Sequence, residues 1–525
     1  MPRELDLTLR LEEAENDVAL RAAVARRARV DPERIGEVRI LRKAIDARGT
    51  GAKLRLRVRA FYDGERADPE RPWDAPRLTP APANGPRVVV VGGGPCGLFA
   101  ALRLAELGVR TLVLDRGKAV QARRRDLATL NKRGIVDPES NYCFGEGGAG
   151  TYSDGKLYTR ADKRGPVAWV LRALVAHGAP QDIVIDARPH IGSNRLPRVV
   201  TRLRETLEVA GCEVRFQARV VAIYRDGGRA RGVRLESGEE IEAAAVVVAT
   251  GHSAGDVFEL LAAAGATVEP KGFALGIRVE HPQPLIDSIQ YGRDARHPLL
   301  PAATYRLATT VGGRGVYSFC MCPGGWIVPA TTAADRVVVN GMSLARRDSP
   351  FANSGIVVAL EPQDFEALGH RGPFGGVELQ AAIERCAATL GGGSQAAPAQ
   401  RLTDVIAGRE SRSLPRSSYR PGMRAAPLHA ELPPLVVEPL RAALTRFGRV
   451  MRGYVTSEAV AVGVESRSSS PLRIVRDPET LESPTIAGLY PAGEGAGYAG
   501  GIVSAALDGL RIAERLAASE TSGGG

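Results

Sequence analysis

Residues 88–115 have the sequence VVVVGGGPCGLFAALRLAELGVRTLVLD, in which four valines lead into three glycines, a helix-like stretch and a second apolar run that ends at an acid. Gly92, Gly94 and Gly97 form a GxGxxG pattern between a buried strand and a helix, and Asp115 closes the next strand. The first glycine permits a tight turn, the second lets backbone approach a pyrophosphate, and the third lets helix pack on strand. The stretch therefore predicts a dinucleotide site, with a glycine turn in an ordinary βαβ unit as the alternative. Asp115 can bind the adenosine ribose, which argues against a 2′-phosphate.

The far end of the chain decides between NAD and FAD. A flavin cofactor is longer, and residues 490–501, YPAGEGAGYAGG, supply a second glycine-rich turn between a strand and a helix. Glu494 is placed to bind cofactor hydroxyls. The helix that starts near Gly501 can direct its amides toward the flavin edge where negative charge grows on reduction. Residues 246–256, VVVATGHSAGD, add a strand end that returns to the cofactor. These features predict noncovalently bound FAD.

Length and composition are those of a multidomain globular protein, with 525 residues of which 44% are hydrophobic. The net charge is +11, but the arginines are scattered among acids, which argues against a nucleic-acid partner. Six cysteines without a CxxC pair argue against a disulfide framework or a bound metal. The chain lacks the ~20 uninterrupted apolar residues of a membrane span. Because its first residues also carry charges that a signal peptide would not, we expect a cytoplasmic protein.

Composition and periodicity predict an α/β protein of four segments. Residues 1–80 form a small α+β module, which ends in the Pro-rich linker DPERPWDAPRLTPAPANGPR, so a protein that begins near Asn84 should still bind FAD. Residues 87–270 are the first part of a Rossmann-type FAD-binding domain, 271–440 an inserted α+β substrate domain, and 441–525 the C-terminal part of the FAD-binding domain. A second GxGxxG for NAD(P)H is not convincing, because LGGGS at 390–394 follows a helical stretch and lacks a downstream acid.

The run FGEGGAGTYSDGKLYT, residues 144–159, predicts backbone that wraps closely around a ligand, with a glycine-rich surface loop as the alternative. Lys156 in this run could polarise the flavin or a substrate carboxylate, or be a solvated cap. From all these stretches and neighbouring turns, we predict that the cofactor is bound by Gly92, Gly94, Pro95, Gly97, Asp115, Arg116, Gly147, Gly148, Ser153, Asp154, Val220, Thr250, Gly251, Gly493, Glu494, Gly500, Gly501 and Ile502.

Lys156, Arg467 and Tyr498 are the predicted catalytic residues. Arg467, in the stretch ESRSSSPLRI, is the preferred anchor for an anionic substrate, because a guanidinium binds a carboxylate at two points. An ordinary ion pair with Glu465 or Asp477 is the alternative for Arg467.

Two histidines and two cysteines lie near these motifs. His252 and His281 could donate protons, although a lone histidine in a loop is more often structural. Cys320 and Cys322 form a C-x-C pair, and in an extended strand both side chains point to one face, so a bridge between them is strained. We therefore favour packing or pocket lining over dithiol chemistry, and the spacing of the cysteines excludes an iron–sulfur site.

Five stretches together resemble the bacterial family of uncharacterised FAD-dependent dehydrogenases: VVVVGGGPCGLFAAL, NYCFGEGGAGTYSDGKLYT, VYSFCMCPGG, ESRSSSPLRIVRD and LYPAGEGAGYAGGIVSAALDG. That family belongs to the glutathione-reductase-like flavoproteins with one dinucleotide fold. The resemblance covers about residues 1–515, including KAIDAR at 43–48, and implies fold and cofactor rather than a substrate. Cys96 stands where alanine is common, and Cys143 where a glutamine is common, close to a loop expected to face the flavin.

The sequence thus predicts an FAD-dependent oxidoreductase that moves a hydride between an organic substrate and the flavin, with an unidentified electron donor or acceptor as partner. A monooxygenase or oxidase is the alternative within the enzymes, because hydroxylases also occur among flavoproteins with one dinucleotide fold. A flavin-bearing redox sensor or binding protein without turnover is the alternative from another class. The sequence leaves the oligomeric state open.

Overall fold

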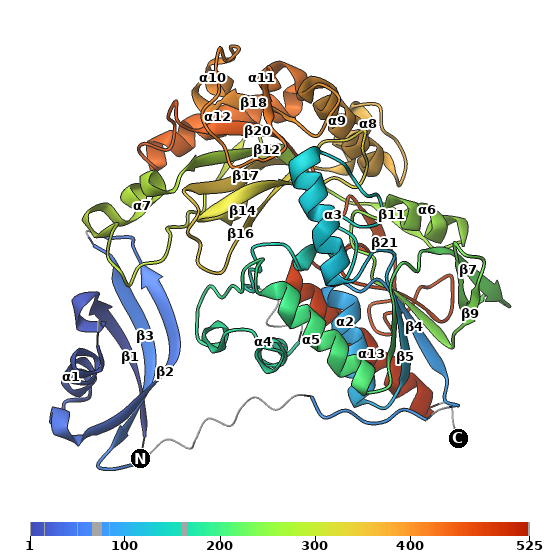
Figure 1. Cartoon of the computed structure of the whole chain (residues 1–525), viewed down its shortest axis with the longest axis horizontal. Coiled ribbons are helices and arrows are strands. Elements are labelled where there is room, and N and C mark those ends of the chain that lie inside the picture. Colours follow the sequence, from blue (N-terminus) through green and yellow to red (C-terminus); the bar gives the residue numbers. More distant parts are fainter. Residues whose placement is uncertain are drawn as a thin grey trace.

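The structure, a computed structural model, describes residues 2–14, 16–49, 51–65, 76–82, 84–159 and 165–522, without the side chains of 519–522. Residues 68–75 of the predicted linker lie outside the described residues. Figure 1 shows three bodies: a small N-terminal module, a seven-stranded sheet covered by helices, and an α/β unit that contains the C-terminus.

The α/β unit is built on a five-stranded parallel sheet with the order β22-β10-β4-β5-β6. Its strands are β4 (Arg87–Val91), β5 (Arg110–Leu114), β6 (Glu213–Arg215), β10 (Ala245–Val248) and β22 (Leu489–Pro491). Both faces of this sheet are covered, which explains the four consecutive valines. Val88 and Val90 pack into the core on one face, and Val89 and Val91 pack into the core on the other.

Helices cover one face of the parallel sheet: α2 (Pro95–Glu106), α4 (Val167–Ala176), α5 (Leu196–Val209) and α13 (Ile502–Ser522). The other face is covered by α6 (Gly255–Ala263) and by the antiparallel strands β7 (Val220–Asp226), β8 (Arg229–Leu235) and β9 (Glu240–Glu242). Helix α3 (Val120–Arg133) follows β5, and β11 (Val268–Pro270) pairs with β21 (Leu472–Ile474) in a separate two-stranded sheet. The predicted strand, glycine turn, helix and strand around residues 88–115 are confirmed.

The larger sheet is mixed and has the order β13-β14-β17-β12-β20-β18-β19. Its strands are β12 (Phe273–Pro282), β13 (Ala308–Val311), β14 (Arg314–Cys322), β17 (Phe351–Leu360), β18 (Ala397–Arg401), β19 (Met423–Ala425) and β20 (Val460–Glu465). One core joins this sheet to its helices, which are α7 (Gln283–Tyr291), α8 (Pro362–Ala367), α9 (Gly375–Gly391), α10 (Leu402–Ala407), α11 (Leu428–Glu431) and α12 (Pro434–Val450). A hairpin of β15 (Gly325–Pro329) and β16 (Val339–Ser343) also belongs to this part of the chain.

The chain returns to the α/β unit later than residue 441, where the sequence predicts that the second part of the FAD-binding domain begins. Most of α12 and all of β20 lie beyond 441, and both belong to the larger sheet and its core. Strand β20 pairs with β12 and β18, which are remote in the sequence, so no local pattern marks the crossing point.

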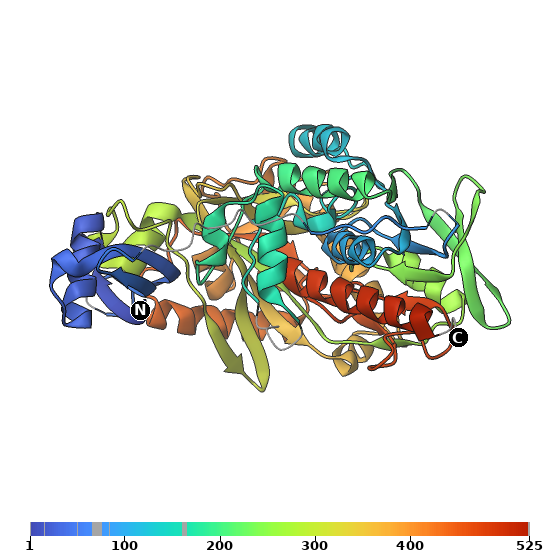
Figure 2. The ribbon, with the colours of Figure 1, turned by 90° about the horizontal axis from the view of Figure 1, so that it is seen from below.

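The N-terminal module is a three-stranded antiparallel sheet, ordered β1-β3-β2, with one helix packed on it. It consists of β1 (Arg3–Arg10), α1 (Asp17–Ala28), β2 (Ile35–Asp46) and β3 (Lys53–Tyr62). The module lies at one end of the elongated molecule (Figure 2). It contacts the region after α7, where the amide of Ala52 donates to the Asp294 carboxylate at 2.8 Å. Among the helices of the described residues, none has the length and apolar character needed to cross a membrane.

Candidate active site

Four glycine or acidic positions follow neighbouring parallel strands at one edge of the five-stranded sheet. Gly92 follows β4, Asp115 follows β5, Gly251 lies just beyond β10, and Gly493 lies just beyond β22. The carboxyl ends of parallel strands meet at the same edge, which is where open α/β sheets bind their ligands. The two glycine turns from opposite ends of the sequence therefore lie at one site, which we call the strand-end site.

The three glycines of the GxGxxG pattern have different surroundings. Gly92 has φ +107°, and a Cβ there would lie 2.5 Å from the Ala249 carbonyl oxygen. A Cβ on Gly97 would lie 1.9 Å from the Gly92 carbonyl oxygen. A Cβ on Gly94 would meet only the Gly148 Cα, at 3.9 Å. Gly92 and Gly97 are thus needed for the packing of the turn, whereas Gly94 leaves open the surface that a pyrophosphate would approach.

Helices α2 and α13 begin side by side at this edge. A Cβ on Gly509 would lie 2.2 Å from the Cys96 carbonyl oxygen, so the two helices are in backbone contact. A Cβ on Gly150 would lie 3.2 Å from Pro95 and 3.4 Å from Ile502, the first residues of the two helices. No side chain caps the start of α2. The edge therefore presents two adjacent helix N-termini, which is the donor arrangement that a dinucleotide requires.

Asp115 and Arg116 form bonds within the protein. Asp115 is 5% exposed, and its carboxylate accepts the N–H groups of Gly93 at 2.9 Å and Gly117 at 2.8 Å. Arg116 donates to Glu139 at 2.6 Å and to Asp256 at 2.9 Å. Asp115 thus holds two turns at the strand-end site in place, and its predicted bond to the ribose stays a prediction, as does the cofactor contact of Arg116.

A fully buried arginine that the sequence analysis missed organises the glycine-rich loop. Arg123, on α3, donates to the carbonyl oxygens of Asn141, Tyr142, Gly145, Glu146 and Gly148 at 2.8–3.3 Å. It lies in the run ARRRD, which has the composition of a solvated helix face, so composition gave no signal. The loop also joins the GxGxxG turn, because the Gly147 N–H donates to the Gly93 carbonyl oxygen at 2.8 Å.

The polar end of this loop faces the larger sheet. Asp154 is 1% exposed and pairs with Arg347 at 2.8 Å and with Lys156 at 3.3 Å. The Lys156 Nζ lies 3.7 Å from the Cys320 Sγ and 3.5 Å from the Cys322 Sγ. Burial alone would lower the pKa of Lys156, but Asp154 and the two thiols raise it overall, so Lys156 is a fixed positive charge. Ser153 binds within its own loop, where its hydroxyl donates to the Gly150 carbonyl oxygen.

Opposite Lys156, the inner face of the larger sheet carries a second buried ion pair. Arg278 and Glu465, from β12 and β20, are 0% and 1% exposed and bond at 2.7 Å. Arg278 also donates to Asn353 at 2.7 Å, to Asn340 at 3.0 Å and to the Cys320 carbonyl oxygen at 3.3 Å. We call these residues, together with Lys156, Asp154, Arg347 and Cys322, the buried charge cluster.

Arg467 lies beside the same sheet in a different ion pair from those that the sequence suggests. Its guanidinium binds Glu384 at two points, both at 2.9 Å, instead of Glu465 or Asp477. Tyr498 accepts the backbone N–H of Arg476 at 3.1 Å, and the Arg476 guanidinium lies 3.8 Å from the centre of its ring. Substrate binding by Arg467 and catalysis by Tyr498 stay predictions.

Glu494 lies at the second glycine turn beside His252, with 3.4 Å between the Nδ1 and Oε1 atoms. Burial opposes its charge, but His252, the Gly501 N–H and Lys271 together hold the pKa of the Glu494 carboxyl below its usual value. Gly501 has φ +101°, and a Cβ on either Gly500 or Gly501 would meet no atom within 4 Å. This turn therefore combines a carboxylate with open backbone at the start of α13.

The other predicted residues divide between the site and the core. Gly251 has φ +74° and open space at its Cβ position, and with Thr250 it adjoins the GxGxxG turn. Val220 is 8% exposed and packs in the core below the sheet edge. His281 is fully buried, bonds to the Tyr454 carbonyl oxygen at 2.7 Å, and has a pKa lowered to about 4 by burial. His281 is therefore neutral, and its second ring nitrogen, Nδ1, has no hydrogen-bond partner in the part of the chain that the structure describes.

Profiles of four known domain families match the chain. A family described as "FAD binding domain" matches residues 86–255, and one described as "FAD dependent oxidoreductase" matches residues 190–347. The description "FAD-dependent protein, C-terminal domain-like" applies to residues 272–468, and a domain of unknown function matches residues 1–61. With the strand-end site, these matches define an FAD-dependent oxidoreductase.

A protein of Clostridium beijerinckii, described as uncharacterized, is 39% identical over 518 residues, which is 95% of each chain. The present chain belongs to the same family. Similar solved structures include the flavin-dependent brominase Bmp2, at 13% identity and TM-score 0.36 over 84% of this chain and 80% of that one. A tetracycline destructase, Tet(51), is 9% identical with TM-score 0.35 over 84% and 83% of the two chains.

Proposed function

We propose that this FAD-dependent oxidoreductase is a dehydrogenase that transfers a hydride between a small organic substrate and noncovalently bound FAD, in the glutathione-reductase-like arrangement. FAD supplies the two-electron chemistry. The observation that carries the proposal is the pair of adjacent helix N-termini at Pro95 and Ile502, beside the open surface of Gly94. The inner face of the larger sheet provides the wall opposite the strand-end site, where a substrate would lie.

In this proposal the chain's own groups bind and orient the cofactor. The start of α2 takes the pyrophosphate and Asp115 the ribose, with Arg123 holding the loop that packs over them. Glu494 binds a cofactor hydroxyl, and the Gly500–Ile502 backbone at the start of α13 faces the edge of the ring where negative charge grows. Arg116, Ser153, Asp154 and Thr250 complete the predicted cofactor environment, whereas Val220 packs in the core behind it.

The substrate side contains fixed charges rather than an obvious base. Lys156 keeps its proton and is 35% exposed, so its ammonium group can orient an anionic or carbonyl oxygen of the substrate. His252, held at 3.4 Å from Glu494, is the nearest candidate for moving a proton. Arg467 remains our choice for a second substrate contact. Tyr498, behind the second glycine turn, remains a candidate catalytic residue.

Anaerobic photoreduction of the bound flavin, followed by reoxidation with a panel of acceptors that includes oxygen, tests this proposal. A dehydrogenase is reoxidised faster by an organic or nicotinamide acceptor than by oxygen. Fast reoxidation by oxygen favours the monooxygenase or oxidase alternative. A flavin that no acceptor reoxidises at a useful rate supports a binding or sensing role without turnover.

A further inference from the structure

The two cysteines of strand β14 share one lysine. The Nζ of Lys156 lies 3.7 Å from the Cys320 sulfur and 3.5 Å from the Cys322 sulfur. The thiol of Cys322 in turn donates to the backbone carbonyl oxygen of Cys320 at 3.3 Å. Lys156 comes from the glycine-rich loop and the cysteines from the larger sheet, so this contact joins the two halves of the active site.

The backbone at Cys320 departs from the extended strand that we expected from the sequence. Cys320 has φ +45°, and the pairing of β14 with β17 shifts register between Phe319 and Cys322. Side chains two residues apart in a regular strand point in the same direction and stay apart. The irregularity instead turns both sulfurs toward one ammonium group. A non-glycine residue in this region of φ is uncommon and often lies at a functional site.

The formal charges of the buried charge cluster do not balance if both thiols are neutral. Three cations face two carboxylates, which leaves one positive charge: these groups are Lys156, Arg278, Arg347, Asp154 and Glu465. Further titratable groups adjoin them, among them Glu280, Asp186 and His190. Burial raises the pKa of Glu280 and Asp186 and lowers the pKa of His190, so burial favours the neutral form of each. Burial also raises the pKa of Glu465, but its ion pair with Arg278 at 2.7 Å favours the carboxylate, whereas Glu280 accepts from Ser418. One thiolate would neutralise the cluster.

The cluster also holds polar atoms without partners within the protein. Among the described residues, the Nδ2 of Asn353 and the Oδ1 of Asp154 have no hydrogen-bond partner, although these residues are 0% and 1% exposed. The site is nevertheless reachable, because Cys320 is partly exposed and the side chain of Lys156 is 35% exposed. Unpaired polar groups beside an accessible nucleophile indicate a place where a small polar ligand can bind.

We propose that Cys320 is a thiolate paired with Lys156, and that it is a covalent site for small uncharged soft electrophiles such as α,β-unsaturated carbonyl compounds. The Cys320 sulfur adds to the electron-poor alkene carbon, and the resulting enolate takes a proton from water. No oxidant or reductant is consumed. The adjoining Cys322 thiol, with the positive charges of Lys156 and Arg278, lowers the pKa of Cys320 well below the usual thiol value. Cys320 and burial raise the pKa of Cys322, which therefore keeps its proton.

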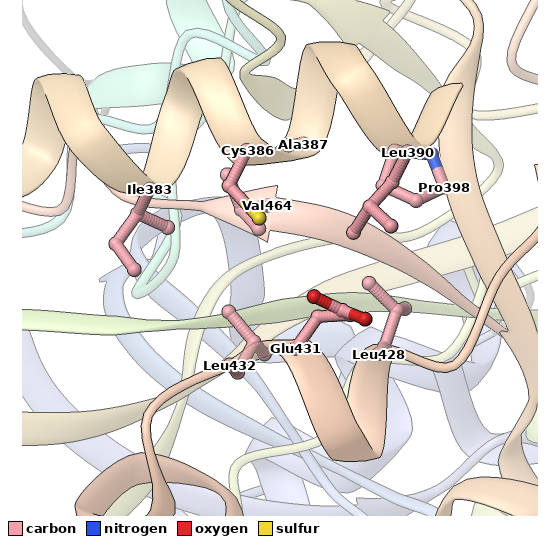
Figure 3. Close-up of a pocket in the computed structure, with 9 residues that line it drawn as sticks. All are labelled: Ile383, Cys386, Ala387, Leu390, Pro398, Leu428, Glu431, Leu432 and Val464. Carbon is pink, nitrogen blue, oxygen red and sulfur yellow. The ribbon is translucent and has the colours of Figure 1, made fainter. Parts of the chain in front are cut away.

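Cys386 provides an internal control with the opposite surroundings. It lies on α9 in a small apolar pocket, where the carboxylate of Glu431 points toward it (Figure 3). Burial and Glu431 raise the pKa of Cys386. Cys320 and Cys386 are both free and partly exposed, so their reactivities compare a cysteine beside a cation with a cysteine beside an anion.

The test is alkylation of the flavin-loaded protein by iodoacetamide, with each site quantified by peptide mass mapping. At about pH 6.5, two units below the usual cysteine pKa, we expect Cys320 to react at least about 10-fold faster than Cys386. Iodide leaves as the sulfur–carbon bond forms. The reaction of a thiolate therefore includes no proton transfer that could limit its rate. Lys156→Met should slow the Cys320 reaction about 10-fold, and Lys156→Arg should restore most of the rate.

Equal rates for the two cysteines, or an unchanged Cys320 rate in Lys156→Met, would overturn the proposal. If Lys156→Met fails to fold, the ultraviolet absorption of the thiolate provides the test instead. It is measured as the difference in absorbance between the wild type and Cys320→Ser at about pH 6.5. A thiolate signal lost in Cys320→Ser supports the proposal, and its absence from the wild type refutes it. Cys386→Ser serves as the matched control and should leave the thiolate signal in place.

Discussion

The strand-end site and the buried charge cluster, which we propose to be the two halves of one active site, are built from different kinds of groups. At the strand-end site, backbone and glycine form the binding surface: turns at Gly92 and Gly493, helix starts and an acid that binds two amides. In the charge cluster, long side chains from distant segments form ion pairs in the interior. The first half is specified by local sequence, and the second by tertiary structure. We therefore expect cofactor binding to depend on the open space beside the backbone, and the chemistry of the substrate to depend on the buried charges.

The largest expected effect separates the two roles of glycine at the strand-end site. Gly97→Ala should prevent folding, with a cost above the roughly 3 kcal/mol of ordinary overpacking, because its Cβ would lie 1.9 Å from the Gly92 carbonyl oxygen. Gly94→Val should fold, since Gly94 has extended backbone and open space around it, but should lose most of its flavin. Urea unfolding and flavin absorbance measure the two effects. A Gly94→Val protein that keeps its flavin would show that this open surface is not the pyrophosphate site.

The difference between the two halves also explains which parts of the site could be predicted from the sequence. The strand, turn and helix at 88–106 and the second glycine turn were predictable, because their signals lie within a few residues of one another. Arg278 and Glu465 are 187 positions apart, and nothing in either neighbourhood indicates the other. Arg467 lies within two residues of an acid that we considered, yet its partner is Glu384, 83 positions away. Arg123 was hidden because a buried arginine that donates to carbonyl groups has the same local composition as a solvated one.

A second expected effect belongs to the larger sheet and depends on pH. The pKa of His281 is about 4 in the folded protein and about 6.5 when unfolded, so acid favours unfolding through this group. The free energy of unfolding should be unaffected by this group above about pH 6.5 and should fall by about 3 kcal/mol as the pH drops toward 4. His281→Gln should remove this part of the acid loss while lowering stability at neutral pH. Urea midpoints measured across the range check it, and an unchanged acid limb in the variant would contradict the assignment.

A third, smaller effect compares one carboxylate of the strand-end site with one cation beside the larger sheet. Glu494→Gln should weaken FAD binding by about 1.5–3 kcal/mol, the range for a hydrogen bond to a charged group. Arg467→Met should leave flavin affinity nearly intact and lower the melting temperature, because it leaves the buried Glu384 without its two-point partner. Flavin titration and thermal unfolding of both variants separate the effects. Equal flavin loss in the two would show that the halves are not divided as we propose.

The smallest expected effect concerns the N-terminal module. The linker composition predicts a boundary near Asn84, but Thr79 donates to the Ala105 and Glu106 carbonyl oxygens at the end of α2, so the cut belongs earlier, at Pro76. A protein of residues 76–525 should bind FAD with an affinity within about 0.5 kcal/mol of the full chain, since the module contacts the region after α7 and, through the backbone of Lys43, residues 185–187, rather than the strand-end site. Removing it bares Tyr291, Leu299 and Leu300, so some loss of solubility is expected.

Asp294→Ala in the full chain, which removes the bond to Ala52, is the control for loosening the module without deleting it. Loss of flavin from the truncated protein, but not from Asp294→Ala, would mean that the module supports the cofactor half after all.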